Sequence, residues 1–242
     1  MIYFFYMRVN KYLSLCGLGS RRHVESLVTA GRVRLNGVVI TDLATLIPED
    51  ATVTVDNRPV KPTTDKVYIL LNKPAGVVST TYDPQGRPTV LDVILSNPKQ
   101  YATLLKSVRL YPVGRLDYHT CGLLILTNDG ALTKQLTHPS THVDKLYHAT
   151  VDRPVTKSEL ETLSQGVKID GVKTAPASFT YIKHDRTQIQ VIIHEGRNRQ
   201  IRKMFETLGI KVTHLTRLQE GKLSLGNLPV GDWKFIRKSQ II

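Results

Sequence analysis

The chain has 242 residues, of which 41% are hydrophobic and 22% charged, a composition that is typical of one or two folded domains and excludes a disordered chain. Lys and Arg number 33 against 20 Asp and Glu, so the formal net charge is +13. This excess favours a polyanionic partner, nucleic acid rather than a membrane. The two cysteines, Cys16 and Cys121, form no Cys-X-X-Cys pair, which predicts free thiols and a cytoplasmic location.

The first six residues, MIYFFY, are mostly apolar. They are too few to cross a bilayer, and no basic segment precedes them. We therefore expect residues 1–6 to be an N-terminal extension, with Met7 as an alternative start, and we expect no membrane partner.

Two short helices are predicted next. Apolar residues recur at helical spacing up to Cys16, and Gly17 ends the first helix. Ser20 is a suitable N-cap for a second helix over residues 21–30, which Gly31 ends.

Short strands with an Asn36-Gly37 hairpin turn complete a small unit over residues 7–62. Basic side chains concentrate beside the turn between its helices, where side chains and a helix N-terminus can reach phosphates together. A solvated surface is the alternative explanation for these charges. The predicted RNA contacts of this unit are Lys11, Arg21, Arg22 and Arg32.

The stretch MRVNKYLSLCGLGSRRHVESLVTAGRVRLNG, residues 7–37, resembles an S4 RNA-binding domain. The order of helix, Ser-Arg-Arg, helix and Gly-Arg-Val-x-x-Asn-Gly carries the resemblance, which extends to about residue 60. It implies a general RNA clamp and does not say what chemistry follows.

Residues 63–66 are predicted to be a polar linker, and residues 67–242 form the second unit. Its strands and helices alternate without regular βαβ spacing, which indicates an α+β fold with a mixed, largely antiparallel sheet flanked by helices. The clearest predicted elements are a buried strand over 123–126, a capped helix over 156–165, a strand over 187–196 and a helix over 198–209.

Several kinds of site are excluded. No Gly-x-Gly-x-x-Gly follows a strand and no Walker loop is present, so a nucleotide cofactor is not expected. His138 and His142 are four residues apart, but Pro139 lies between them and no further ligand completes a metal site. We expect neither a cofactor nor a metal.

One acid stands out. Asp117 comes just before the buried strand, with Arg115 before it and Thr120 after it. A carboxylate that acts on an RNA nucleotide must stay ionised beside phosphates, and a paired guanidinium would lower its pKa by ~1–3 units. The alternative is an ordinary turn residue.

The segment EGRNRQIRKMF is the expected source of that guanidinium. In a helix, Arg199 and Lys203 project away from the apolar stripe, toward solvent or phosphate. Arg202 lies at the border of the stripe and is the predicted ion-pair partner of Asp117, with a solvated arginine as the alternative.

The segment DKLYHATV, residues 144–151, alternates like a strand. Lys145 and Tyr147 fall on one face. The ring of Tyr147 is suited to stacking on a base, although an ordinary strand tyrosine fits the same pattern.

Taken together, these elements resemble the bacterial ribosomal RNA pseudouridine synthases that carry an S4 domain. The resemblance covers nearly all of residues 67–233, and its most specific motif is Gly-Arg-Leu-Asp-x-x-Thr-x-Gly-Leu-Leu. It implies that Asp117 is the essential aspartate, paired with Arg202, and that Tyr147 stacks on the target uracil. It also implies that Arg115 fills the space of an extruded base and that Lys145 supports the site. The matching segments are LNKPAGVVST, DPQGRPTV, GRLDYHTCGLLILTNDG, KLYHATV, EGRNRQIRKMFETLG and VTHLTRLQEGKLSLGNLP.

The implied reaction is isomerisation of a uridine to pseudouridine without a cofactor. Asp117 either adds to the nucleotide or removes a ribose proton to give a glycal, and both routes stay open. The substrate is expected to be 23S ribosomal RNA, or a ribosome-assembly intermediate, bound by a monomer. The alternatives are the same chemistry on 16S RNA and a non-catalytic S4-type ribosome-assembly factor.

Overall fold

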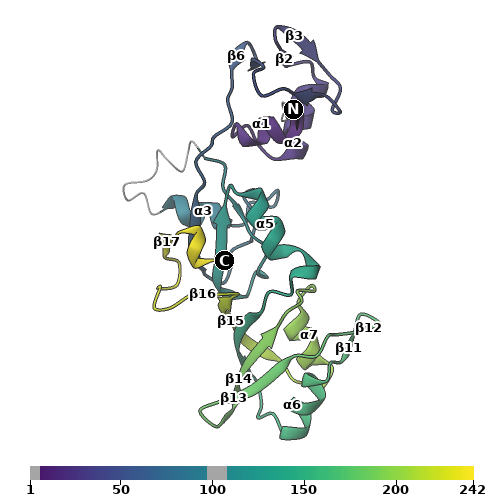
Figure 1. The fold of residues 1–242 in the computed structure, drawn as a ribbon. Helices are drawn as coiled ribbons and strands as arrows, with labels where there is room; N and C mark the ends of the chain where they lie inside the picture. The colour runs from purple at the N-terminus through teal and green to yellow at the C-terminus, as the bar shows by residue number, and fades with distance from the viewer. Residues whose placement is uncertain (1–5, 97–107) are drawn as a thin grey trace. The chain divides into compact units, whose positions relative to one another are not determined.

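The computed structural model describes residues 6–96 and 108–242, which form two compact units (Figure 1). Within these ranges the smaller unit holds residues 6–67 and 108–110, and the larger unit holds residues 68–96 and 111–242. The predicted extension over residues 1–6 lies, apart from Tyr6, outside the described residues. No helix within the described ranges is long and apolar enough to cross a membrane.

The smaller unit contains both predicted helices, and their apolar faces share one core with the strands. Ser20 caps the second helix, since its Oγ accepts a hydrogen bond from the His23 amide at 3.1 Å. Asn36 and Gly37 turn the predicted hairpin with φ angles of 48° and 85°. The elements are β1 (Met7–Arg8), α1 (Val9–Leu15), α2 (Arg21–Thr29), β2 (Val33–Leu35), β3 (Val38–Ile40), β4 (Leu46–Ile47), β5 (Val53–Val55) and β6 (Arg58–Pro59).

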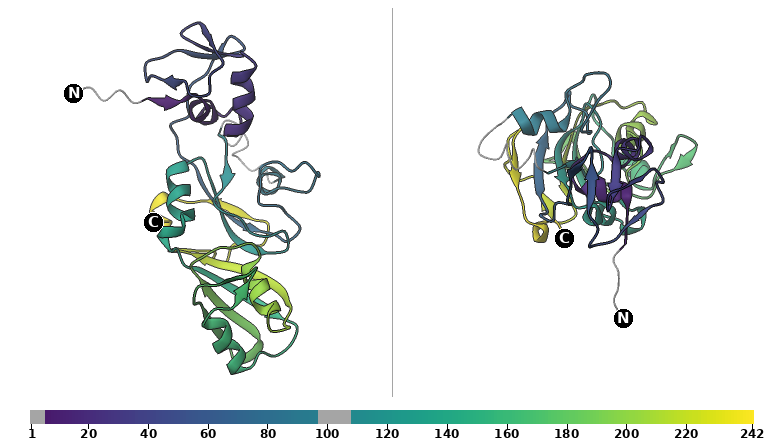
Figure 2. Two further views of the ribbon diagram at one scale, coloured as in Figure 1. Left: turned by 90° about the vertical axis from the view of Figure 1, so that its right-hand side faces the viewer. Right: turned by 90° about the horizontal axis from the view of Figure 1, so that it is seen from above.

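The larger unit is built on a nine-stranded sheet with helices against it (Figure 2). The elements that precede its middle are β7 (Tyr68–Lys73), α3 (Val90–Ser96), β8 (Tyr111–Pro112), β9 (Cys121–Thr127), α5 (Gly130–Thr137), η1 (Pro139–Thr141) and β10 (Lys145–Val151). Those that follow are α6 (Lys157–Ser164), β11 (Lys168–Ile169), β12 (Val172–Lys173), β13 (Ser178–Ile182), β14 (Asp185–Ile193), α7 (Gln200–Glu206), β15 (Val212–Glu220), β16 (Leu223–Ser224), β17 (Trp233–Phe235) and η2 (Lys238–Gln240).

The strand order is β13-β14-β10-β15-β9-β7-β17, with β16 beside β15 and β8 beside β9. Every pair in this sheet is antiparallel except β15 with β9. The predicted α+β class, with a mixed and largely antiparallel sheet, is therefore confirmed.

The parallel contact between β15 and β9 brings the two halves of the sheet together. A β-carbon at Gly122 would lie 2.2 Å from the carbonyl oxygen of Arg217, and the φ of Gly122 is +104°. Only glycine fits this close approach of two backbones. The four residues after it, 123–126, are fully buried, as the sequence predicts.

The observed starts of two helices, α6 and α7, can be compared with the predicted ones. Thr156 and Glu159 form the predicted capping box of α6. α7, in contrast, begins at Gln200 rather than at residue 198, because Arg199 adopts a left-handed backbone with φ 51°.

Candidate active site

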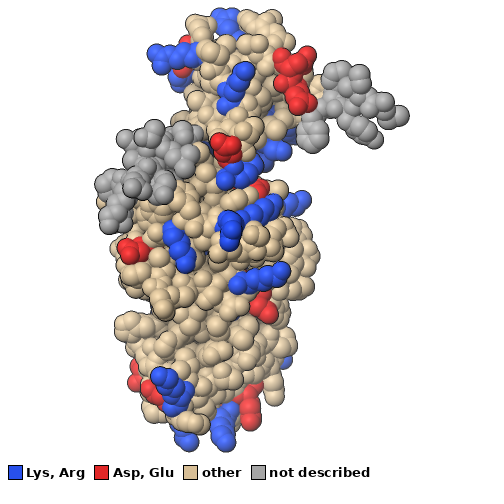
Figure 3. Space-filling view, turned by 60° about the vertical axis from the view of Figure 1, so that its left-hand side comes forward, with Lys and Arg blue, Asp and Glu red and all other residues tan. Residues whose placement is uncertain are grey.

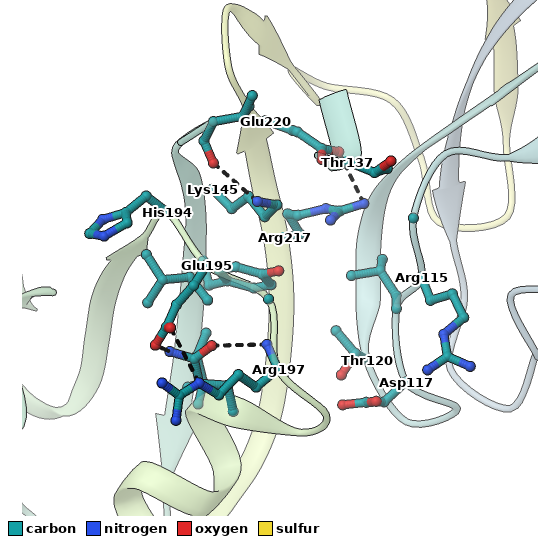
Figure 4. A pocket seen from close by; sticks show the side chains of 18 of the residues that line it. Arg115, Asp117, Thr120, Thr137, Lys145, His194, Glu195, Arg197, Arg217 and Glu220 are labelled. Carbon is teal, nitrogen blue, oxygen red and sulfur yellow. Dashed lines mark hydrogen bonds and ion pairs between the residues drawn. The ribbon is translucent and has the colours of Figure 1, made fainter. Parts of the chain in front are cut away.

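The larger unit contains a cavity of about 570 Å³, a size that is typical of small-molecule sites. Its walls come from both halves of the sheet, which meet at the β9–β15 contact (Figure 4). On one side are the loop before β9 and the end of α5. On the other are β10, β15, the end of β14 and the segment that leads into α7.

Asp117 points into this cavity from the loop before β9, next to Thr120 (Figure 4). The amide of Thr120 donates to the carbonyl oxygen of Asp117 at 3.0 Å, which closes the turn. Thr120 is buried, and its hydroxyl has no hydrogen-bond partner among residues 6–96 and 108–242. A carboxylate and an unpartnered hydroxyl therefore face the same space, where a ligand can take up both.

Lys73, at the end of β7, holds the backbone of this loop. Its side chain has 0% exposure, and burial lowers the pKa of Lys73 to about 8. Its Nζ donates to the carbonyl oxygens of Pro74 at 2.9 Å, Asp117 at 3.2 Å, Tyr118 at 3.4 Å and Thr120 at 2.9 Å. Lys73 is not among the predicted site residues, although a lysine at the end of the apolar strand YILLNK indicates a side chain that needs buried partners.

Tyr147 lines the cavity from β10, between β14 and β15. Its side chain is only 8% exposed, and burial raises the pKa of its hydroxyl. The strand geometry that places Tyr147, Ala149 and Val151 on one buried face is the predicted one. The ring therefore has a fixed position in a wall of the space that Asp117 faces.

Arg202 does not form the predicted ion pair. Asp117 and Arg202 both lie in the described ranges, and no contact within 4.0 Å joins their charged groups among the ion pairs described there. Instead, the guanidinium donates to the carbonyl oxygens of Val212 at 2.6 Å and His119 at 3.4 Å. Val212 is the first residue of β15, and His119 belongs to the loop before β9. Arg202 is thus attached to the backbone of the loop that carries Asp117.

Arg217 and Glu220 form a buried ion pair in the cavity wall, which the sequence analysis also missed (Figure 4). Each side chain is 2% exposed, and Nη2 of Arg217 lies 3.3 Å from Oε2 of Glu220. Residues three apart in a regular strand point to opposite faces. Here a register shift opposite Leu146 and Tyr147 brings both side chains to one face.

The predicted basic contacts of this unit divide into two groups. Arg115, Lys145 and Arg199 line the cavity, and Nζ of Lys145 donates to the Val143 carbonyl at 3.0 Å. Lys203 does not line the cavity, because its ammonium is paired with Asp170.

In the smaller unit, Lys11, Arg21 and Arg22 are exposed, and each keeps its charge open to solvent. Arg32 differs, because its guanidinium makes a two-pronged contact with Asp56, with Nε 2.9 Å from Oδ1. On the face that Figure 3 shows, basic side chains are spread among acidic ones rather than gathered in one patch.

The chain matches two family patterns: the S4 domain over residues 7–53 and the RNA pseudouridylate synthase domain over residues 67–207. A relative in Bacillus subtilis (strain 168), named ribosomal large subunit pseudouridine synthase B, is 39% identical over 229 residues, covering 93% of this chain and 90% of the relative. An uncharacterized RNA pseudouridine synthase of Aquifex aeolicus (strain VF5) is 36% identical and covers 97% of this chain and 92% of its own length.

A solved structure described as a pseudouridylate synthase has the same fold, with a TM-score of 0.67 and 26% sequence identity. The match covers 97% of this chain and 98% of that one. Sequence and fold agree, and the chain therefore belongs to the RNA pseudouridylate synthase family and carries an N-terminal S4 domain.

Proposed function

We propose that this enzyme converts one uridine of large-subunit ribosomal RNA to pseudouridine, with Asp117 as the catalytic carboxylate. The observation that carries the proposal is the cavity in which Asp117 faces the wall that holds Tyr147. The name of the Bacillus relative supports the large subunit as the source of the substrate.

The reaction rearranges one nucleoside. The C1′–N1 bond breaks, the uracil turns while it stays in the cavity, and a C1′–C5 bond forms. The proton lost from C5 is balanced by the proton that N1 gains, so no electrons enter or leave. Asp117 starts the reaction either by adding to the nucleotide or by removing a ribose proton, and both routes need its ionised carboxylate in contact with the sugar.

The uridine must first leave its stack, which costs a few kcal/mol. Stacking on Tyr147 offsets part of that cost, since the contact of a base with an aromatic ring is worth ~1–3 kcal/mol. Arg115, at the cavity rim, is suited to occupy the space the base leaves. Lys145 supplies positive charge beside Tyr147.

Arg202 acts in this proposal as a positioning residue. Its contact with the His119 carbonyl fixes the loop that carries Asp117. Burial and the nearby Arg199 lower the pKa of Arg202, whereas the carboxylate of Asp117 acts to raise it.

Binding of the rest of the RNA is assigned to the S4 domain, through Lys11, Arg21 and Arg22, and to Arg199 beside the cavity. The protein is proposed to act as a monomer in the cytoplasm, on 23S RNA or on a ribosome-assembly intermediate that contains it.

The test is pseudouridine mapping of ribosomal RNA from cells that lack the protein and are complemented with the wild type or with Asp117→Asn. The wild type should restore one modification in large-subunit RNA. The variant should restore none, while its affinity for that RNA stays within a few fold of the wild type.

If Asp117→Asn restores the modification, the reaction does not need the Asp117 carboxylate, and a non-catalytic S4-type factor is favoured. If the pseudouridine that is missing from these cells lies in 16S rather than 23S RNA, the proposed reaction stands and the substrate is 16S RNA.

A further inference from the structure

An exposed aromatic ring lies on the loop between β7 and α3. Tyr82 is 75% exposed, the largest value among the large apolar side chains that the structure describes. The loop leaves the sheet and projects from the larger unit (Figure 2, left). An aromatic side chain in this position contributes little to the core of the protein.

The loop is nevertheless well fixed. The carboxylate of Asp83 accepts hydrogen bonds from Nε and Nη2 of Arg87, at 3.0 and 2.7 Å, and from the Arg87 amide at 3.0 Å. The Asp83 side chain is 6% exposed. Gly86, whose φ is +71°, donates its amide to the Asp83 carbonyl at 3.1 Å and completes the turn. Tyr82 is therefore presented by a loop that is already ordered, which lowers the entropic cost of binding.

The base of the loop is attached to the segment that carries Asp117. The Ser79 hydroxyl donates to the Leu116 carbonyl at 2.8 Å and accepts from the Leu116 amide at 3.1 Å. The Gly76 amide donates to the Tyr118 carbonyl at 2.9 Å. The position of the loop is thus coupled to the position of Asp117 by direct hydrogen bonds.

A second exposed tyrosine follows Asp117 directly. Tyr118 is 37% exposed and makes a T-shaped contact with His119, with ring centroids 4.9 Å apart. Arg87, half exposed, is electrostatically coupled to the Tyr118 hydroxyl. None of the residues Tyr82, Arg87 and Tyr118 lines the cavity. We name these three exposed residues, two on the loop after β7 and one directly after Asp117, the tyrosine shelf.

We propose that the tyrosine shelf binds an unpaired RNA nucleotide next to the target uridine, with its base stacked on Tyr82. This inference rests on the proposed function, since it needs a uridine in the cavity beside Asp117. Two rings with an adjacent guanidinium match the way proteins bind single-stranded RNA, by sequence-tolerant stacking and a nearby positive charge. Contacts to flanking nucleotides are also how enzymes that extrude a base choose its context.

RNA fits this surface better than a protein partner does. The exposed groups of the shelf are rings and a cation, and the Asp83 carboxylate is screened by Arg87. Tyr118 directly follows Asp117, and the loop of Tyr82 is bonded to Leu116, which lines the cavity. The neighbours of a nucleotide held in the cavity cannot lie far from these segments.

The experiment measures binding of a 23S RNA transcript by full-length Tyr82→Ala, Tyr82→Phe and the control Val230→Ala, another exposed apolar residue of the larger unit. Tyr82→Ala should weaken binding about 5- to 100-fold, whereas Tyr82→Phe and Val230→Ala should stay within about twofold of the wild type. The slope of log affinity against log salt should not change for Tyr82→Ala, because stacking releases no counterions.

Pseudouridine formation separates this proposal from the previous one. With saturating RNA, Tyr82→Ala should still form the product, whereas Asp117→Asn should not. If Tyr82→Ala binds the transcript as tightly as the wild type, the shelf does not stack on RNA, and loss of association with ribosomal particles would then indicate a protein partner. Failure of the wild type to modify the transcript would count against the proposed function, while the binding comparison would still decide the stacking proposal.

Discussion

Nζ of Lys73 lies 3.2 Å from the carbonyl oxygen of Asp117, so a buried ammonium on β7 fixes the backbone of the proposed catalytic residue. The two residues are 44 positions apart in the chain. The same ammonium bonds the Thr120 carbonyl at 2.9 Å and thereby holds both ends of the turn. The position of Asp117 thus depends on a side chain that never enters the cavity.

Lys73→Met should damage both stability and catalysis. The methionine keeps the length of the side chain but removes the Nζ hydrogen bonds to the carbonyls of Pro74 and Thr120, at a cost of ~1–3 kcal/mol for each that is left unpaired. The carbonyls of Asp117 and Tyr118 keep the amides of Thr120 and Gly76 as donors. We expect a loss of ~2–4 kcal/mol in urea denaturation and, at temperatures where the variant is folded, a rate at least ten times lower. Lys234→Met, an exposed lysine on β17 of the same sheet, is the matched control. Wild-type stability of Lys73→Met would show that the hydrogen bonds have no role.

The lowered pKa of Lys73 predicts a pH dependence of stability. The pKa is about 8 in the folded protein and about 10.4 in an unfolded chain. Between these values the unfolded state binds more protons, so the contribution of Lys73 to the free energy of unfolding rises with pH, by up to ~1.4 kcal/mol per unit. Denaturation curves at several pH values above 8 should show wild type gaining stability relative to Lys73→Met. A difference that does not vary with pH would refute the lowered pKa.

The buried pair of Arg217 and Glu220 predicts strong coupling. Removal of one partner leaves the other charge buried and unpaired, so Arg217→Met and Glu220→Leu should each cost ~3–5 kcal/mol. The double variant Arg217→Met/Glu220→Leu should regain a large part of that loss, because no buried charge remains. Urea denaturation of all three variants gives the coupling energy, and additive losses would show that the two charges do not interact.

The local patterns that predicted the fold correctly are those whose cause lies within a few residues. The Ser20 cap, the Asn36-Gly37 turn and the buried strand over 123–126 each follow from neighbouring residues. Tyr147 was also placed correctly, because strand alternation alone determines its face. The role of Asp117 stays a prediction, which rests on its position in a basic chain and on its motif.

The residues that were missed depend on contacts between distant segments. Lys73 closes an apolar strand, and its acceptors come from a loop more than 40 positions away. Arg217 and Glu220 share a face only because of a register shift, which no local pattern marks. Arg202 bonds backbone carbonyls, which carry no sequence signal, and its predicted pairing with Asp117 is not among the ion pairs of the described residues.

The S4 domain offers a test of which basic residues bind phosphate. Arg21 and Arg22 are exposed at the start of α2, whereas Arg32 is already paired with Asp56. Each phosphate contact that is lost should reduce the slope of log affinity against log salt by about 0.7–0.9. Arg21→Ala and Arg22→Ala should therefore flatten the salt dependence of binding to a 23S RNA transcript. Arg32→Ala should leave that slope unchanged, because its guanidinium is already paired with Asp56. Slopes equal to that of the wild type for Arg21→Ala and Arg22→Ala would mean that this face of the domain does not contact RNA.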